Sequence, residues 1–166
     1  FKQWNSKEEL DKLLCEQIAV VANMKDADDI DGFSQSFGGV KHNSGKYCGD
    51  TFYGTSLKNG QCAALAEKWQ IIAPVKNDTH GVLHMNHMIH EKYRRDSITL
   101  AENRKYPEIA PKVGAEGIVY GDKVINVVNK QRKCSSSYEG YVANGEIGVI
   151  CGPAKKKTFT VVFSSQ

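Results

Sequence analysis

Residues 142–150 read VANGEIGVI, and this stretch constrains the fold more than any other in the chain. Asn144 and Gly145 both tolerate a positive φ, and β-branched residues follow them at Ile147, Val149 and Ile150. An Asn-Gly pair between such residues predicts a tight type I′ hairpin turn within a small β-structure.

Short strand-like segments surround this turn from residue 116 to residue 163, with a loop expected over 131–140. Closely spaced strands with glycine and asparagine turns predict a small barrel over residues 113–166. Because a unit of about 50 residues buries little surface by itself, we expect it to lean on the preceding part of the chain. The expected core of the barrel consists of Val124, Val127, Val142, Ile147, Val149, Val161 and Phe163.

The first part of the chain, residues 1–112, begins with a helical pattern. Ser6 and Glu9 form a capping-box pattern ahead of apolar residues at helical spacing, which predicts a helix over about residues 7–24. A short helix is expected over 61–68, whereas 33–60 is expected to be a loop or an irregular hairpin, and 96–112 a linker.

The segment WQIIAPVKN, residues 69–77, predicts a short buried strand over 70–73 that Pro74 ends. A polar loop follows, in which Asp78 or Thr79 is expected to cap a helix over about residues 81–94. A strand that leads into a helix through a polar loop is typical of an α/β layer. Ligands bind at the carboxyl ends of strands in such layers, which places Lys76, Asn77 and His80 where a phosphate or a base is met.

Charge is unevenly distributed along the 166 residues. The formal net charge is +3: residues 1–70 carry 8 lysines and 10 acids, giving −2, and residues 71–166 carry 14 basic residues and 9 acids, giving +5. A mildly basic second part permits a nucleic-acid partner but equally fits a solvated face.

Five cysteines, an odd number without close pairs in the sequence, favour reduced thiols in a cytoplasmic protein over a disulfide framework or a zinc site. No apolar run reaches the roughly 18 residues that span a membrane, so no membrane partner is expected. The chain begins at Phe1 and ends shortly after a strand-like segment, and we expect it to be a piece of a longer polypeptide.

Two further patterns suggest chemistry that the sequence does not support. GGVKHNSGKY has five residues between Gly39 and Gly45 and a tyrosine at the hydroxyl position, so it does not match a phosphate-binding P-loop. His80, His84, His87 and His90 lie on or just before one predicted helix, but without an obvious carboxylate ligand; no metal site is predicted.

GDKVINVVNKQ followed by GYVANGEIGVI is similar to a signature of RecD-like superfamily 1 DNA helicases. In that family the signature forms an SH3-like barrel inserted in the second RecA-like motor domain. WQIIAPVKNDTHGVLHMNHMIHEKYR resembles the strand–loop–helix segment of the same family, whose basic, glycine and asparagine positions fall on Lys76, Gly81 and Asn86. The resemblance covers about residues 69–163 and matches residues 1–68 only loosely.

The resemblance implies a partial RecA-like P-loop NTPase domain of the α/β class over residues 1–112, followed by a small SH3-like β-barrel over 113–166. It places the chain in the UvrD-like C-terminal region of a helicase, whose whole motor uses ATP and Mg²⁺. This segment lacks the motifs that bind ATP, so no catalytic residue and no cofactor of its own is expected.

Single-stranded DNA and the remainder of the motor are the partners that follow from the resemblance. Cations for phosphates and flat or polar groups for bases are the chemistry of such a surface. The candidate DNA-binding residues are Lys76, His80, Lys123, Asn129, Lys130 and Arg132. Two alternatives stay open: an SH3-like protein-interaction module that binds no nucleic acid, and a metal or hydrolytic enzyme using the histidines.

Overall fold

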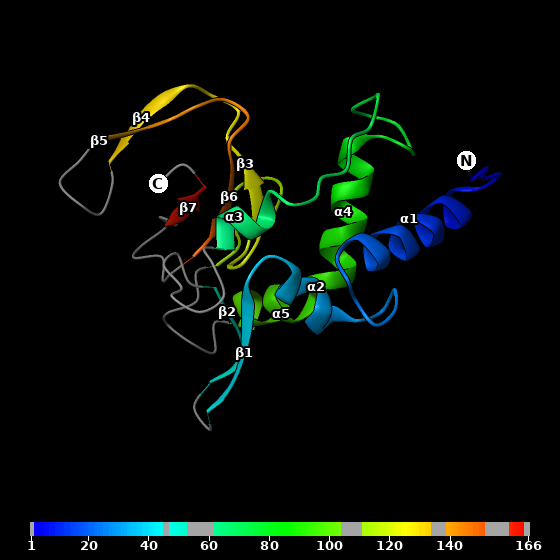
Figure 1. Ribbon diagram of the computed structural model, residues 1–166, viewed down its shortest axis with the longest axis horizontal. Helices are drawn as coiled ribbons and strands as arrows, with labels where there is room; N and C mark the ends of the chain where they lie inside the picture. Colours follow the sequence, from blue (N-terminus) through cyan, green and yellow to red (C-terminus); the bar gives the residue numbers. More distant parts are fainter. Residues whose placement is uncertain are drawn as a thin grey trace.

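The chain forms mixed helical and β structure in a computed structural model that describes residues 2–44, 47–52, 62–103, 111–133, 139–151 and 160–164. Figure 1 shows α1 and α4 on one side and the strands of the second part on the other. The helices are α1 (Lys7–Val21), α2 (Ile30–Ser36), α3 (Cys62–Ala66), α4 (Val82–Tyr93) and α5 (Arg95–Asn103). The strands are β1 (Gly39–Ser44), β2 (Tyr47–Phe52), β3 (Lys123–Ile125), β4 (Lys130–Lys133), β5 (Glu139–Val142), β6 (Ile147–Ile150) and β7 (Val161–Phe163).

Helix α1 begins where the capping pattern predicts. The Ser6 hydroxyl accepts a hydrogen bond from the backbone N–H of Glu9 at 3.2 Å, and the Glu9 carboxylate accepts one from the backbone of Asn5 at 2.8 Å. The helix ends at Val21, three residues before the predicted end, because Asn23 takes a left-handed conformation with φ of 55°.

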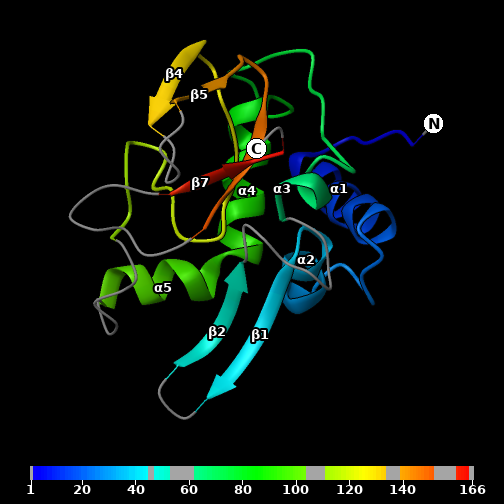
Figure 2. The ribbon, with the colours of Figure 1, turned by 60° about the vertical axis from the view of Figure 1, so that its left-hand side comes forward.

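The region predicted as a loop or irregular hairpin contains both a helix and a hairpin. Asp29 caps α2 by accepting a hydrogen bond from Gly32 at 2.9 Å, and this short helix was missed because it has only seven residues. Strands β1 and β2 then pair antiparallel, with Gly39 opposite Phe52. The sequence that resembled a P-loop therefore starts in a β-hairpin, whose two strands project from the molecule in Figure 2.

Three local predictions before residue 112 have different outcomes. The short helix over 61–68 and the helix over 81–94 are confirmed as α3 and α4. Residues 70–73 form no strand, so the α/β layer predicted there is not formed by the described residues. Part of the predicted linker is helix α5, because Ile98 and Ala101, three residues apart, bury one helical face against Val119.

The second part of the chain contains one long antiparallel ribbon. Lys123 lies opposite Val149 in the β3–β6 pair, and Lys130, seven residues later, lies opposite Val142, seven residues earlier, in the β4–β5 pair. The register is therefore the same on both sides of the interruption at residues 126–129 and 143–146. Strand β7 completes a three-stranded antiparallel sheet in the order β3-β6-β7.

Three predictions about this region differ from what the structure shows. The Asn144-Gly145 pair does not reverse the chain between two paired strands: only Gly145 has a positive φ, at 91°, and the pair interrupts one arm of the ribbon between β5 and β6. Residues 130–133, most of which were predicted to be loop, form strand β4. Among the described residues the three-stranded sheet is open, and no closed barrel is formed.

The interruption of the ribbon is organised by one buried side chain, that of Asn126. Its amide nitrogen lies 2.8, 3.1 and 2.8 Å from the carbonyl oxygens of Val128, Val142 and Ala143. Its backbone N–H donates to Glu146 at 2.8 Å. Asn126 thus satisfies carbonyl groups that the regular ladder would otherwise have paired, and it joins the two halves of the ribbon.

One cluster of buried side chains connects the first and second parts of the chain. It joins Phe33, Phe37 and Tyr93 of the helical part to Ile147 and Val149 of the ribbon. Of the predicted barrel core, Val142, Ile147, Val149 and Phe163 are buried, whereas Val127 is 70% exposed. The division at residue 112 stays a prediction, and the expectation that the β-unit leans on the helical part is met by this shared core.

Candidate nucleic-acid interface

The loop before α4 is folded tightly onto the first turn of that helix. The first two N–H groups of α4 donate to the carbonyls of Val75 and Lys76, at 3.0 and 3.2 Å. A Cβ on Gly81 would lie 2.7 Å from the Lys76 carbonyl oxygen, so the close approach requires glycine. Loop carbonyls therefore accept hydrogen bonds from the free N–H groups at the start of the helix. The prediction of a side-chain cap from Asp78 or Thr79 is wrong, because no side chain caps α4.

Lys76 and His80 lie on the surface of this loop. Lys76 is exposed and makes no ion pair within the described part of the chain. The His80 ring is half-buried, with Nδ1 3.9 Å from the Asp78 carboxylate and its centroid 5.9 Å from that of Trp4. The loop thus carries a cation and an imidazole, and the indole of Trp4 lies beside the imidazole; cations and aromatic rings are the groups that hold a phosphate and an unstacked base.

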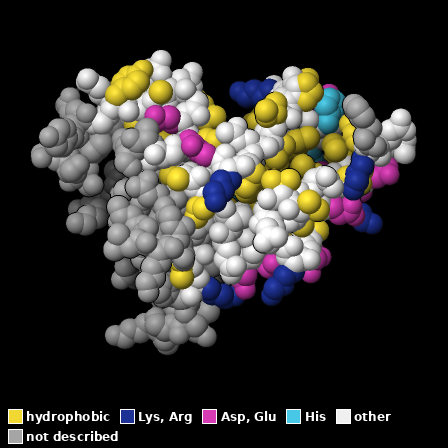
Figure 3. All heavy atoms as spheres, in the orientation of Figure 1, with side chains coloured by type: hydrophobic (Ala, Val, Ile, Leu, Met, Phe, Trp, Pro, Cys, Tyr) yellow, Lys and Arg dark blue, Asp and Glu magenta, His cyan; other side chains and the backbone are white. Residues whose placement is uncertain are grey.

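An apolar surface adjoins the same loop. Ile72 is 89% exposed, and Val75, Val82 and Leu83 are each more than a third exposed. Figure 3 shows hydrophobic side chains gathered on this side of the molecule, over α4 and α1. A contiguous apolar surface of this kind is typical of a site that another part of a protein covers.

Three of the predicted DNA-binding residues lie together on the β-ribbon. The Asn129 side chain accepts a hydrogen bond from the backbone N–H of Asn144 at 2.6 Å, and this bond joins the two arms of the ribbon where the regular pairing is interrupted. Lys130 and Arg132 lie in β4, where their backbones pair with Val142 and Gly140 of β5. The side chains of Lys130 and Arg132 fall outside the described part of the structure.

The same ribbon carries large exposed apolar side chains. Ile125, Val127, Val128 and Tyr141 are between 55% and 70% exposed. Tyr141 is therefore not a core residue, and its phenol ring is exposed to a partner. Aromatic and aliphatic groups on a narrow ribbon suit either a stacked base or the apolar side chains of another protein.

Lys123, the remaining predicted cation, is directed inward. Its ammonium lies 4.4 Å from the centroid of the Trp69 ring and donates a hydrogen bond to the Trp69 carbonyl. Burial lowers the pKa of Lys123 to about 8, an effect that Glu67 partly opposes. Lys123 thereby fastens the ribbon to the segment before α4, and its charge is shielded by the indole.

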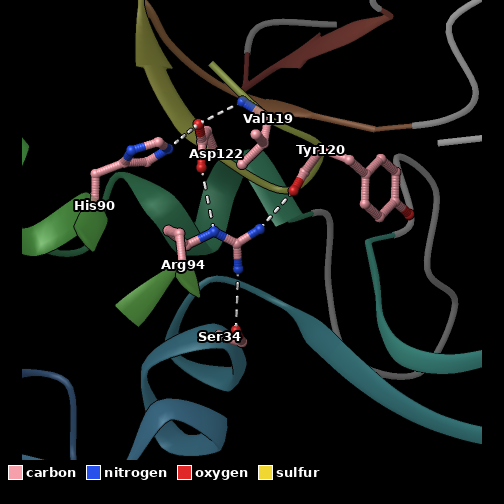
Figure 4. Close-up of polar contacts among 6 residues, drawn as sticks. All are labelled: Ser34, His90, Arg94, Val119, Tyr120 and Asp122. Carbon is pink, nitrogen blue, oxygen red and sulfur yellow. Dashed lines mark hydrogen bonds and ion pairs between the residues drawn. The ribbon is translucent and has the colours of Figure 1, made fainter. Parts of the chain in front are cut away.

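A buried polar network fixes the ribbon to α4, as Figure 4 shows. The Asp122 carboxylate accepts hydrogen bonds from Arg94 Nε at 3.1 Å, from His90 Nε2 at 3.0 Å and from the Val119 backbone at 2.8 Å. Arg94 also donates to the Tyr120 carbonyl at 2.5 Å. Its side chain is 4% exposed and that of Asp122 is 9% exposed, so this ion pair is removed from water.

Gly121 allows this network to form. It has a φ of 82°, and a Cβ there would lie 2.3 Å from both Arg94 Nη2 and the Phe52 ring. Arg94 in turn reaches Ser34 of α2 at 3.3 Å. The turn before β3, helix α4 and helix α2 therefore meet at one guanidinium group, which sets the position of the ribbon relative to the loop that carries Lys76.

The histidines of α4 are distributed among different contacts. His84 Nε2 lies 2.8 Å from Asp11 of α1, and His90 contacts Asp122, while His87 is exposed. Among the described residues, no group of three or more side chains is arranged to hold a metal ion. The metal or hydrolytic alternative thus gains no geometric support from these residues.

The predicted binding residues fall into two groups. Lys76 and His80 lie on the loop before α4, and Asn129, Lys130 and Arg132 lie on the ribbon, with Lys123 between them in β3. In Figure 1 the β4–β5 ribbon and the loop before α4 lie at opposite sides of the view. No described helix is long and apolar enough to cross a membrane.

Sequence reasoning missed the residues that hold these groups in place. Arg94 and Asp122 are 28 residues apart, and only the Gly-Asp pair at the start of the helicase-like signature marked Asp122. Trp69 was assigned no role, although the Lys123 ammonium lies over its ring and donates to its carbonyl.

Comparisons with protein-family models, with curated proteins and with solved structures found no match to this chain.

Proposed function

We propose that this chain is part of a RecD-like superfamily 1 DNA helicase and that it contributes a surface for single-stranded DNA. It does not hydrolyse ATP by itself, since phosphoryl transfer requires a P-loop, a metal ligand and an arginine together. ATP and Mg²⁺ belong to the whole motor. In this proposal residues 1–112 are part of the second RecA-like domain, and residues 113–166 are its SH3-like insert.

The pairing of the two halves of the signature carries the proposal. GDKVINVVNKQ and GYVANGEIGVI form opposite arms of one ribbon in a single register, and Asn126 of the first arm donates a hydrogen bond to Val142 of the second. Asp122, at the start of the signature, bonds to Arg94 at the end of the other helicase-like segment. The two segments that resemble the helicase are thus in direct contact, which supports their being parts of one functional unit.

The surface chemistry supports a non-specific grip on a single strand. The exposed Lys76 can meet a phosphate, and Tyr141 on the ribbon can stack on a base, a contact worth about 1–3 kcal/mol per base. Lys123 has a supporting role in this proposal, because Trp69 shields its charge. Backbone contacts and stacking carry no sequence information, so binding is expected to be independent of sequence.

The remainder of the motor is the proposed partner of the apolar surface beside the loop. Ile72, at 89% exposure, lies within residues 70–73, a strand-like sequence without a strand partner among the described residues, and Val75, Val82 and Leu83 are exposed in the loop and helix that follow. Another part of the motor that covered these side chains would remove them from water. Burying them would stabilise the contact by about 25 cal/mol for each Å² of apolar surface.

The test is a titration of fluorescently labelled oligo-dT with the purified chain at low and high salt, followed by anisotropy. We expect weak binding that salt reduces, and Lys76→Ala should lower the affinity and make the salt slope shallower by about 0.7. Lys25→Ala is the matched control, because it removes an exposed lysine that lies four residues beyond the C-terminal end of α1. It should change neither the affinity nor the salt slope. Absence of binding at low salt would contradict the proposal.

A second candidate function is an SH3-like protein-interaction module that binds no nucleic acid. The exposed apolar side chains of Ile125, Val127, Val128 and Tyr141 favour it, because they are unusual on a solvated ribbon. The same titration separates the two functions: a binding module of this kind leaves oligo-dT unbound at every salt concentration.

A further inference from the structure

Two cysteines that are 89 residues apart in the sequence meet in the core. Cys62 is the first residue of α3 and Cys151 directly follows β6, and their sulfur atoms are 3.1 Å apart. Both are free thiols, and their exposures are 1% and 4%. This contact belongs neither to the proposed DNA-binding residues nor to the Arg94–Asp122 network.

The environment distinguishes the two thiols chemically. The hydrogen bond from Cys151 lowers the pKa of the Cys62 thiol, although burial opposes this. The same contact, followed by burial, raises the pKa of Cys151. Cys62 is therefore the sulfur that more readily forms a thiolate, and the thiolate is the nucleophile in disulfide chemistry.

We propose that Cys62 and Cys151 are a redox-active pair, which a low-molecular-weight disulfide such as glutathione disulfide converts into an intramolecular disulfide between α3 and the end of β6. Since the fold already holds the two sulfurs side by side, closing the bond requires little rearrangement and no diffusive encounter. The inference does not depend on whether the chain binds DNA.

The reaction proceeds in two exchange steps. The Cys62 thiolate attacks one sulfur of glutathione disulfide, which forms a mixed disulfide and releases one glutathione thiolate. Cys151 then loses its proton and attacks the Cys62 sulfur, which releases the second glutathione. Two protein thiols are oxidised, one small disulfide is reduced, and the two protons end on the two glutathione thiols. Because both sulfurs are buried, the exchange waits for local opening around α3 and is slow.

The test is to equilibrate the purified chain at a series of ratios of reduced to oxidised glutathione, quench with acid, block free thiols and map the peptides by mass spectrometry. We expect one dominant cross-linked pair, Cys62 with Cys151, even in buffers that leave most glutathione reduced. The oxidised protein should melt about 5–10 °C higher than the reduced protein, because the bond closes a long loop.

Cys15→Ser is the matched control, because Cys15 is equally buried but its sulfur contacts Met88, at 3.7 Å, instead of a described cysteine. This variant should still form the bond, and Cys62→Ser should lose both the cross-link and the rise in melting temperature. The proposal is overturned if the folded wild-type protein forms no Cys62–Cys151 cross-link at any ratio. Preferential pairing of either residue with Cys48 or Cys134 overturns it equally.

Discussion

Removing the Asp122 carboxylate should be among the most damaging single changes in this protein. Asp122→Ala leaves the Arg94 guanidinium, which is 4% exposed, without the carboxylate 3.1 Å from its Nε. It also removes the acceptor for the Val119 N–H, 2.8 Å away. Breaking a buried pair by removing one partner costs about 3–5 kcal/mol, because the remaining charge is buried and uncompensated. That is a large fraction of the roughly 5–15 kcal/mol that stabilises a typical domain.

Urea denaturation followed by circular dichroism measures this loss. The matched control is Asp28→Ala, which removes the partner of Lys92 in an ion pair of similar chemistry, 2.6 Å apart, whose aspartate is 86% exposed. Water replaces that contact, so the control should lose less than about 1 kcal/mol. If Asp122→Ala lowers the free energy of unfolding no more than Asp28→Ala, the Arg94–Asp122 network does not anchor the ribbon.

A double-mutant cycle isolates the pair itself. Arg94→Met, Asp122→Leu and the double variant should give a coupling energy of about 1–3 kcal/mol, since the two side chains share one network. The double variant should be more stable than the sum of the single losses indicates, because no unpaired charge remains buried. Strictly additive losses would show that Arg94 and Asp122 do not stabilise one another.

Three further predictions concern the ribbon and the loop. Asn126→Ala leaves carbonyl groups without their donor and should lower the free energy of unfolding, measured in urea, by about 2–3 kcal/mol. Asn129→Ala removes one hydrogen bond and should lower it by about 1 kcal/mol. Equal losses would contradict the role of Asn126. Because the pKa of Lys123 falls from 10.5 to about 8 on folding, the unfolded chain binds more protons between these values, and stability should rise with pH there. Lys123→Met should remove that rise, and an unchanged pH profile would count against the contact with Trp69. Gly81→Ala should destabilise by about 1–3 kcal/mol, because its Cβ would meet the loop backbone; a melting temperature equal to that of the wild type would exclude the clash.

Sequence patterns predicted best where one local rule decides the structure. Ser6 with Glu9 predicted the start of α1, and apolar residues at helical spacing predicted α4. The end of α1 was misplaced because Asn23 adopts a left-handed conformation, which no periodicity reveals. Helix α5 was hidden by its shortness and by two prolines that follow it, although its two buried residues share one face.

Long-range contacts explain the remaining differences. Asn144-Gly145 satisfied the local rule for a hairpin turn, but pairing of β5 with β4 and of β6 with β3 placed the pair within one arm of the ribbon. Lys123 was predicted to bind DNA because a surface that holds a strand needs cations for phosphates, yet Trp69 and its carbonyl hold the ammonium inward. The meeting of Cys62 with Cys151 depends on how α3 packs on β6, which the sequence spacing does not encode.

Photo-crosslinking of the purified chain to oligo-dT that contains 4-thiothymidine reports which residues touch the strand, so it tests whether this protein holds single-stranded DNA on the proposed residues. We expect crosslinks within the loop at residues 74–81 and on the ribbon around Asn129 and Tyr141, all suppressed by high salt. Crosslinks confined to α1 and α2, or none at low salt, would contradict the assignment of this surface to single-stranded DNA.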